Sequence, residues 1–473
     1  MLPRALLVVI ALLLGASPAA AERVDLLIRH ASVIDVAAGR VVPGRAIAVR
    51  GDTIIASGPD AAIARRYQAT RTVDAAGAFV MPGLWDMHVH FGGGSELVAE
   101  NRALLPLYLA YGITTVRDCA ADLAEDVLRW RSEVASGALL GPRIFTSGPK
   151  LEGPRPIWRG TIEVDSPAEV DRALDRLQAM EVDFVKITDN TLRPPIFMYA
   201  LEAARQHGLR TSAHTPYALT IEQAARAGLS SIEHLDYLIK AGSPQEAQVA
   251  ADFAAGHLTY AQAVDRLSET FDPAYARASY RRLARLGVAV TPTLNMTRII
   301  AWLNETDHSR DEGLSLIGPG LRRTYDWRIQ RAAGWTAQEV ASRRRNYQLS
   351  LRILPMLRDA GIPILAGTDA GYLNSFNYPG IGLHDELARY VEAGLTPAEA
   401  LRTATLTGPA FLRVAPRYGA LAAGRTADIL LLDANPLQDI ANTRRIRMVV
   451  TRGRALDRAA LDGLLAEARV AAR

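Results

Sequence analysis

Eight short apolar runs recur through the middle of this 473-residue chain, and helical segments separate them. Runs of this length predict buried strands. Several intervening helices open with a capping box, in which Ser or Thr stands three residues before Glu. The apolar runs span residues 84–90, 113–117, 143–147, 183–187, 209–214, 230–235, 288–294 and 362–368, and the capping boxes begin at Ser166, Ser243, Thr336 and Thr396. Strands that alternate with helices through right-handed crossovers predict an α/β fold, a (β/α)8 TIM barrel over residues 82–414.

The two ends of the chain have a different pattern. Residues 24–81 carry short β-rich runs at 24–28, 32–35, 46–49, 53–56 and 78–81, separated by turn residues, and two further runs follow after residue 428. Because these runs lack helical spacing, they predict strands outside the barrel. Residues 458–473 are expected to form a C-terminal helix. The gaps after His234 and after Leu294 are longer than one crossover helix needs, so we expect extra helices over the barrel mouth.

The first twenty-one residues predict an export signal. Arg4 precedes the apolar segment 5–14, and three alanines at 19–21 offer the small-residue site at which signal peptides are cut. The apolar segment is too short to span a bilayer comfortably. We therefore expect residues 1–21 to be a signal peptide, and the mature chain to begin at Glu22 as a periplasmic or secreted protein without a membrane anchor.

The composition argues against nucleic acid as a partner. The calculated pI is 9.2, yet the formal net charge is only +4 and the arginines are spread among acids, so no dense cationic surface is expected. Cys119 is the only cysteine and cannot form an internal disulfide. In its apolar strand context it is expected to be a buried small hydrophobe.

Lysine is rare in this chain, because Lys150, Lys186 and Lys240 are the only lysines among 54 basic residues. Lys186 lies inside the apolar run 183–187, where an unpaired ammonium would be costly to bury. An amine can lose its proton, add carbon dioxide and become an anionic carbamate that bridges two metal ions, whereas a guanidinium stays protonated. The position of Lys186 therefore indicates a special chemical role.

Residues of the metal-ligand type stand in or after the predicted strands. His88 and His90 alternate along the first barrel strand, so both imidazoles face one side and can hold one divalent ion of the zinc type. His214, His234 and Asp369 stand at the carboxyl ends of later runs, where barrel enzymes assemble their sites. The five other histidines of the chain do not fit this series.

The order His-x-His, Lys, His, His, Asp resembles the amidohydrolase superfamily in its two-metal, carboxylated-lysine form. By that resemblance, His88, His90 and Asp369 bind one divalent ion, and His214 and His234 bind the second. The ions are expected to be Zn²⁺, with the lysine, carboxylated by carbon dioxide, and a hydroxide bridging both. Asp369 is expected to take the proton of the hydroxide and to deliver it to the departing nitrogen.

The same resemblance implies how the chain is divided. In amidohydrolases a similar pair of terminal segments joins into one small β-sandwich beside the barrel. Residues 22–81 and 415–457 are therefore expected to form a composite β-sandwich domain. The resemblance covers nearly the whole mature chain.

Further motifs are similar to the prolidase-like branch of the superfamily, which includes imidazolonepropionase-like members. These motifs are residues 112–118, 227–234 and 367–370. The resemblance implies hydrolysis of an amide bond in a small substrate, a dipeptide or an N-acyl amino acid. Tyr217, Arg155 and Arg159 are candidates to contact a carboxylate of that substrate.

One departure from this branch keeps the substrate open. Peptidase members often carry Gly-Gly-His in the loop after the third strand, and residues 151–160 replace it here. A lactonase or a cyclic amidase would use the same metal centre. A non-catalytic barrel is disfavoured because every candidate ligand is present, and a mononuclear deaminase because such enzymes do not use a carboxylated lysine on the fourth strand. A homo-oligomer is left open.

Overall fold

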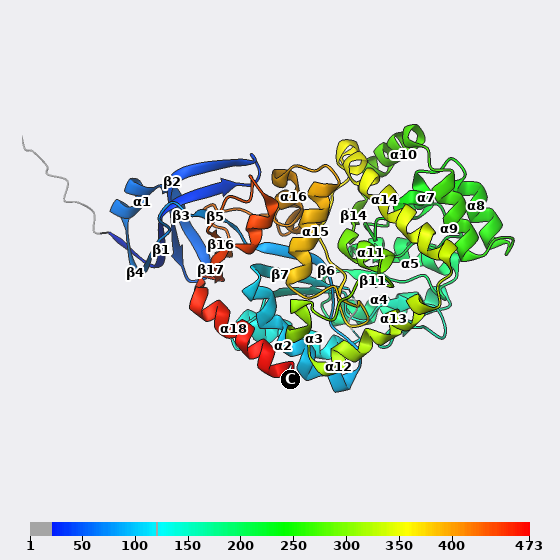
Figure 1. The fold of residues 1–473 in the computed structure, drawn as a ribbon, viewed down its shortest axis with the longest axis horizontal. Helices are drawn as coiled ribbons and strands as arrows, with labels where there is room; N and C mark the ends of the chain where they lie inside the picture. Colours follow the sequence, from blue (N-terminus) through cyan, green and yellow to red (C-terminus); the bar gives the residue numbers. More distant parts are fainter. Residues whose placement is uncertain (1–20, 120–121) are drawn as a thin grey trace, which may run out of the picture.

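The computed structural model describes residues 21–119 and 122–473, so the predicted signal peptide lies almost wholly outside the described residues. The described chain forms a β-rich lobe beside a larger lobe in which helices surround parallel strands (Figure 1). Within the described ranges, no helix is both long and apolar enough to cross a membrane.

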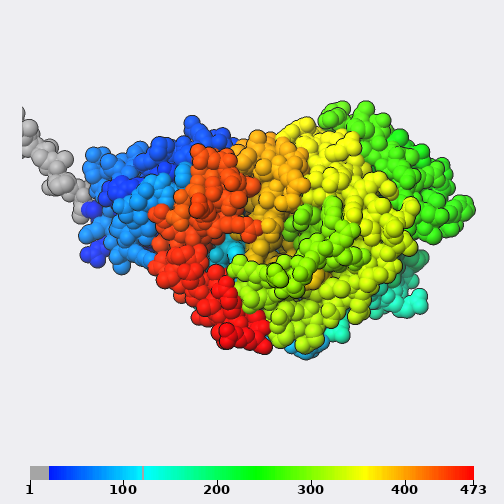
Figure 2. Space-filling view, in the orientation of Figure 1, coloured from blue at the N-terminus to red at the C-terminus, as the bar shows by residue number. Residues whose placement is uncertain are grey.

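Both ends of the chain build one eight-stranded sheet. Its strands are β1 (Glu22–Asp35), β2 (Arg40–Arg50), β3 (Thr53–Pro59), β4 (Tyr67–Asp74), β5 (Phe79–Pro82), β16 (Ile429–Leu432), β17 (Ile446–Thr451) and β18 (Arg454–Asp457). The order is β18-β17-β16-β5-β1-β2-β3, and β4 pairs with β1. The antiparallel pair of β16 with β5 joins the two segments, which lie side by side in Figure 2. An apolar cluster that includes Ile47, Ile429 and Val450 covers one face of this sheet.

The larger lobe contains two parallel sheets. One has the order β15-β6-β7-β8, and the other has the order β10-β9-β11-β12-β13-β14. The strands are β6 (Leu84–His90), β7 (Ile113–Asp118), β8 (Arg143–Thr146), β9 (Leu151–Glu152), β10 (Ile162–Glu163), β11 (Val185–Ile187), β12 (Thr211–Ala213), β13 (Ser231–Glu233), β14 (Ala289–Thr291) and β15 (Ala370–Gly371). Every pair in both sheets is parallel, so the carboxyl ends of these strands meet at a common edge.

Backbone hydrogen bonds connect the two parallel sheets at both sides. The Asp183 N–H donates to the carbonyl of Thr146 at 2.9 Å, beside β8. At the other side, the Leu365 N–H donates to Val290 and the Met87 N–H donates to Ala366, each at 2.8 Å.

The expected strand at residues 362–368 is irregular. Ile364 forms only an isolated bridge with Val290. Pro363 accepts a hydrogen bond from the Val290 N–H but has no N–H to return, which interrupts the ladder at this residue.

Helices separate the parallel strands in the sequence and surround them in space. Those of the crossovers are α2 (Val98–Ala110), α3 (Ala124–Ser136), α4 (Pro167–Ala179), α5 (Pro194–Gln206), α6 (Ile221–Ala227), α10 (Pro273–Arg285), α14 (Ala337–Ala360) and α15 (Ile381–Glu392). The remaining short elements outside the inserted segments are α1 (Asp60–Arg66), η1 (Ser95–Leu97), α16 (Pro397–Thr403), α17 (Thr407–Phe411) and η3 (Ile440–Arg444). The C-terminal helix α18 (Arg458–Ala471) packs on α2.

Extra helices occupy the two long gaps, as expected from their length. After His234 they are α7 (Tyr237–Ala241), α8 (Glu246–Ala254) and α9 (Tyr260–Glu269). After Thr293 they are α11 (Leu294–Ala301), η2 (Glu312–Leu316), α12 (Pro319–Thr324) and α13 (Asp326–Ala333).

One of the four expected capping boxes was wrong. The hydroxyls of Ser166, Thr336 and Thr396 accept from the backbone N–H three residues later, as predicted. Helix α8 instead begins at Glu246 itself. The carboxylate of that residue is committed elsewhere, because it accepts the N–H of Ile221 at 2.8 Å.

Candidate metal centre

The six side chains predicted to bind metal come together at the carboxyl edge of the parallel strands. Five of them line one cavity with about 530 Å³ of empty space, and His88 lies buried directly beneath it. His88 and His90 belong to β6. Lys186 belongs to β11. His214 follows β12, His234 follows β13, and Asp369 directly precedes β15.

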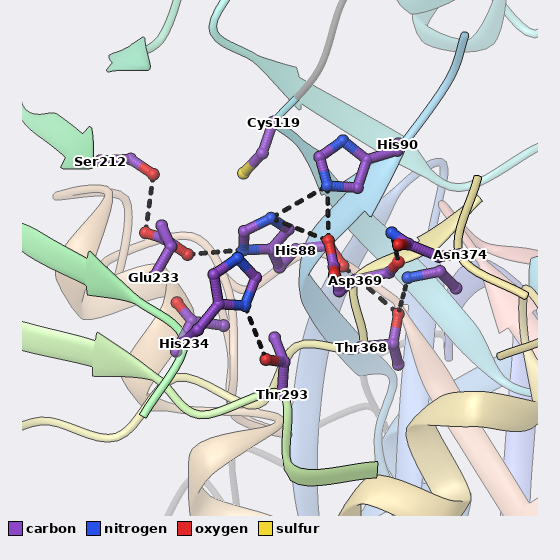
Figure 3. Close-up of polar contacts among 12 residues, drawn as sticks. His88, His90, Cys119, Ser212, Glu233, His234, Thr293, Thr368, Asp369 and Asn374 are labelled. Atoms are coloured by element: carbon purple, nitrogen blue, oxygen red, sulfur yellow. Dashed lines mark hydrogen bonds and ion pairs between the residues drawn. The ribbon is translucent and has the colours of Figure 1, made fainter. Parts of the chain in front are cut away.

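The first group of ligands is compact. His90 Nε2 lies 2.6 Å from Asp369 Oδ1 and 3.1 Å from His88 Nε2, and His88 Nε2 lies 3.4 Å from Asp369 Oδ1 (Figure 3). These three atoms can bind one divalent ion together. The two imidazoles and the carboxylate suit zinc and similar borderline metals.

A second pair of imidazoles faces the same cavity. His214 Nε2 and His234 Nε2 are 3.1 Å apart. His234 Nδ1 is hydrogen-bonded to Thr293 Oγ1 at 2.8 Å, which leaves Nε2 facing its neighbour. The rings of His234 and His88 have centroids 5.2 Å apart, so the two groups are adjacent.

Lys186 is buried beside both groups. Its Nζ has no hydrogen-bond partner among the described residues. Burial lowers the pKa of the ammonium from its ordinary value of 10.5. A buried amine without a partner is the form of lysine that can add carbon dioxide, and a carbamate there would add a second negative charge to that of Asp369.

Glu233 fixes the imidazole of His88. His88 Nδ1 donates to Glu233 Oε2 at 2.6 Å, so its Nε2 carries the lone pair. The carboxylate also accepts from Arg117 at 2.9 Å, from Ser212 at 2.6 Å, and from the hydroxyl of Ser231. Burial alone would raise the pKa of Glu233, but the Arg117 guanidinium and His88 hold it well below its usual range. Glu233 therefore stays ionised and keeps His88 in one tautomer.

Asp369 is held by a separate network. Asp86 accepts the Thr368 N–H at 3.0 Å and the Thr368 hydroxyl at 2.8 Å, and burial raises the pKa of Asp86 to about 7. The side-chain amide of Asn374 donates to the Asp369 carbonyl. Asp369 and His234 have φ of 66° and 73°, a left-handed conformation that is rare for side-chain-bearing residues. Such strain persists where the surrounding contacts specify the geometry.

Glu233 and Arg117 were not predicted as site residues. A signal was present, because each is a charged residue inside a predicted apolar strand, the same argument that identified Lys186. Their opposite charges, buried together at 0% exposure, form an ion pair with 2.9 Å between Arg117 Nη2 and Glu233 Oε2.

The three residues predicted to contact a substrate carboxylate do not line this cavity. Tyr217 lies in a neighbouring pocket, with its ring centroid 4.8 Å from that of Tyr260. Arg159 is exposed and pairs with Glu96 at 3.5 Å, and Arg155 is exposed in the same loop. The residues that complete the cavity wall are instead Lys150, Trp158, Thr188, Arg328, Tyr372, Leu373 and Asn374.

This arrangement of strands and ligands has counterparts among known proteins. The amidohydrolase family pattern matches residues 79–456. The chain belongs to the amidohydrolase family. It is a hydrolase acting on carbon–nitrogen bonds, and the resemblance to the prolidase-like branch of the superfamily is confirmed.

Individual relatives match over most of their length. Ochratoxinase from Aspergillus niger is 26% identical over 480 residues, which cover 87% of this chain and 83% of the relative. The solved structure of bottromycin amidohydrolase has a TM-score of 0.70 and 21% identity, and covers 94% of this chain and 90% of its own. A Xaa-Pro dipeptidase with methionine in its active site has a TM-score of 0.66 and 19% identity, and covers 91% and 99%. The two solved structures share the fold of this chain.

Proposed function

We propose that this amidohydrolase cleaves an amide bond with a binuclear metal centre. In this proposal His88, His90 and Asp369 bind the first ion, and His214 and His234 bind the second. The observation that carries it is the convergence of these side chains around one cavity, with imidazole nitrogens 3.1 Å apart in both groups. Zn²⁺ is the proposed metal because the ligands are imidazoles and a carboxylate.

Lys186 is proposed as the bridge between the two ions, in its carboxylated form. Its support is the buried Nζ without a partner. Burying the Lys186 nitrogen without a hydrogen-bond partner costs free energy, unless a bound group supplies the missing interaction. The carbamate would satisfy the nitrogen and would reduce the repulsion between two dications.

Two divalent ions would polarise the scissile carbonyl and lower the pKa of water from about 15.7 towards about 7. The residues of the chain supply the remaining chemistry. The Asp369 carboxylate lines the cavity, where it accepts a proton from the attacking water and returns that proton to the departing nitrogen. Glu233 keeps His88 in the tautomer that presents Nε2.

The proposed substrate is a dipeptide or an N-acyl amino acid. Support comes from the relatives, because a dipeptidase and an amidohydrolase share the fold and ochratoxinase is 26% identical.

Three structural predictions accompany this function. We propose that the two parallel sheets close into one (β/α)8 barrel, supported by the backbone hydrogen bonds that connect them at both sides. We propose that the composite terminal sheet, formed by residues 22–81 and 415–457, folds as the β-sandwich domain. We also propose that the chain is exported, for which the sequence of residues 1–21 is the support.

The test is a hydrolysis screen combined with metal analysis. Purified protein is supplied with zinc and assayed on N-acyl amino acids, dipeptides, lactones and aminated heterocycles. The proposal expects about two divalent ions per chain and release of a free amine from the amide substrates. Lactone opening alone, or release of ammonia from heterocycles, would contradict the proposed substrate class. A chain that is inactive on all four substrate classes and binds no metal would contradict the proposal of a metal-dependent hydrolase.

A further inference from the structure

Lys150 is the first of the three lysines in the chain, and the proposed metal chemistry does not use it. It is 3% exposed, and it lines the same cavity as the proposed ligands. Its Nζ has no hydrogen bond or ion pair to any described residue. The ammonium lies 4.9 Å from the ring centroid of Trp158, a contact that compensates only part of the cost of burying a cation.

Asp122, Asp118 and Glu152 act on Lys150 by their charge, and each accepts hydrogen bonds from other donors, although Asp122 Oδ1 has no hydrogen-bond partner among the described residues. Asp122 accepts the N–H groups of Gly93 and Gly94 at 2.9 and 3.2 Å. Glu152 accepts from the backbone N–H groups of Gly153, Thr191 and Leu192, and from the side-chain amide of Asn190. Asp118 accepts the Thr146 hydroxyl at 3.0 Å. The negative charges of these acids reduce the free-energy cost of burying the Lys150 ammonium. None of the three carboxylates lies within hydrogen-bond distance of its Nζ.

A second cation, Arg328, faces the same cavity from helix α13. Its Nε donates to the Leu373 carbonyl at 3.2 Å, and its Nη2 donates to Asn374 Oδ1 at 2.6 Å. Asn374 in turn donates to the carbonyl of Asp369. The guanidinium is therefore fixed relative to the proposed metal centre.

Two neighbouring tryptophans, of which Trp158 lines the cavity, contact these cations. The ring centroids of Trp158 and Trp327 are 6.1 Å apart. Lys150 lies against the first ring, and the Arg328 guanidinium carbon lies 5.7 Å from the centroid of the second. Among the described residues that line the cavity, Asp369 is the only acid. A ligand with a negative group would thus meet two cations, Lys150 and Arg328, that line the cavity and have no carboxylate ion-pair partner there.

We propose that Lys150 and Arg328 form an anion subsite, covered by the Trp158–Trp327 pair, that binds the free carboxylate of the substrate. This inference rests on the proposed amide hydrolysis and names its substrate class, namely amides that carry a carboxylate rather than neutral amides or lactones. It also gives a function to the helices inserted after Leu294, because α13 supplies both Trp327 and Arg328.

The test compares two substrates that differ in one charge, N-acetyl-L-phenylalanine and N-acetyl-L-phenylalaninamide. Lys150→Met and Arg328→Met each remove a cation and leave a shorter, unbranched apolar side chain. Each variant is expected to lose roughly 10-fold to 100-fold in kcat/KM on the acid and less than about 3-fold on the amide, because one charge-assisted hydrogen bond is lost. Thermal unfolding of each variant verifies that it is folded.

Arg331→Met is the matched control. Arg331 stacks on the same Trp327 ring, with its guanidinium carbon 4.7 Å from the centroid, but it does not line the cavity. Its ratio of acid to amide turnover should stay within about 3-fold of the parent. An equal loss on both substrates in Lys150→Met and Arg328→Met, or the same change of ratio in Arg331→Met, would overturn the subsite.

Binding separates a failure of the subsite from a failure of the proposed function. Calorimetric titration measures the affinity of both compounds for the metal-loaded parent and variants, with or without turnover. The subsite requires the acid to bind more tightly than the amide, and requires Lys150→Met to remove that preference. A parent that hydrolyses neither compound yet shows this preference contradicts only the function. A parent without the preference overturns the subsite, whatever its activity.

Discussion

The Asp369 side chain has two proposed roles, metal binding and proton transfer. Its Oδ1 lies 2.6 Å from His90 Nε2 within the proposed first group of ligands, and Asp369 also lines the cavity where substrate would enter. His90, His234 and His88 together hold the pKa of Asp369 below its ordinary value, although burial opposes them. An ionised carboxylate at this position can accept a proton as well as bind a metal.

Asp369→Asn separates these two properties. The amide oxygen can still ligate weakly, but it cannot transfer a proton. We expect the variant to keep its fold and much of its metal, and to lose roughly 10²-fold to 10⁴-fold in kcat. Steady-state kinetics beside metal analysis measures both quantities. A kcat close to that of the parent would remove Asp369 from proton transfer.

The candidate metal ligands could be identified from the sequence, but the residues that hydrogen-bond to them and orient them could not. His88 and His90 could be paired by strand alternation, because that rule is local. Glu233 lies 145 residues from His88, and no local rule brings the two together. Tyr217 was favoured for its closeness to His214 in the sequence, but the chain turns its ring into a neighbouring pocket.

At the scale of elements, the apolar runs in the sequence located the parallel strands. The residues at which individual strands begin and end depended on tertiary contacts. Strand β1 is one continuous strand because it pairs with β2, β4 and β5 along its length, where the sequence indicated two shorter runs. Strand β4 was missed because five of its eight residues are exposed, so its sequence lacks an apolar run.

The contact between β15 and β6 places Asp369 beside the histidine pair, and Gly371 permits it. Gly371 has φ of 143°, and an added Cβ would lie 2.1 Å from the His90 carbonyl oxygen. We expect Gly371→Ala to shift His90, to lower stability by about 1–3 kcal/mol and to weaken metal binding. Gly361→Ala is the control, because Gly361 also has positive φ, 81°, but has nothing within 4 Å. Thermal unfolding and metal content of both variants decide the matter, and equal metal loss in both would refute the close-contact explanation.

At the scale of the whole molecule, the two ends of the chain are tied into one sheet beside the catalytic lobe. Ile429–Leu432 pairs with Phe79–Pro82, and the strand after Phe79–Pro82 carries His88 and His90. The sheet therefore anchors the segment that enters the proposed metal centre. The fold class could be expected from the sequence because alternating strands and helices allow few topologies. The pairing across the termini could be expected only by resemblance, because no local pattern encodes it.

Cleavage of the signal peptide before Glu22 stays a prediction. Glu22 is the first residue of β1 and pairs with Tyr67. We expect the exported protein to begin at Glu22, and intact-mass measurement of protein recovered from the cell exterior or periplasm checks this. A mass that retains residues 1–21 would contradict export by signal cleavage.

The central claim is that carboxylated Lys186 bridges two metal ions. Lys186→Ala removes the bridge but leaves space, so acetate in solution should restore part of the metal and the rate. Lys186→Arg keeps a positive charge that cannot become a carbamate and fills the same space, so acetate should not rescue it.

The most direct test is the metal content per chain of Lys186→Arg, measured by plasma mass spectrometry beside the parent, with hydrolysis assayed on the same samples. The account predicts about two divalent ions in the parent, and loss of most metal and nearly all turnover in the arginine variant. A Lys186→Arg protein that still holds about two ions per chain and hydrolyses substrate at the parental rate would contradict the bridging carbamate and leave Lys186 as a structural lysine.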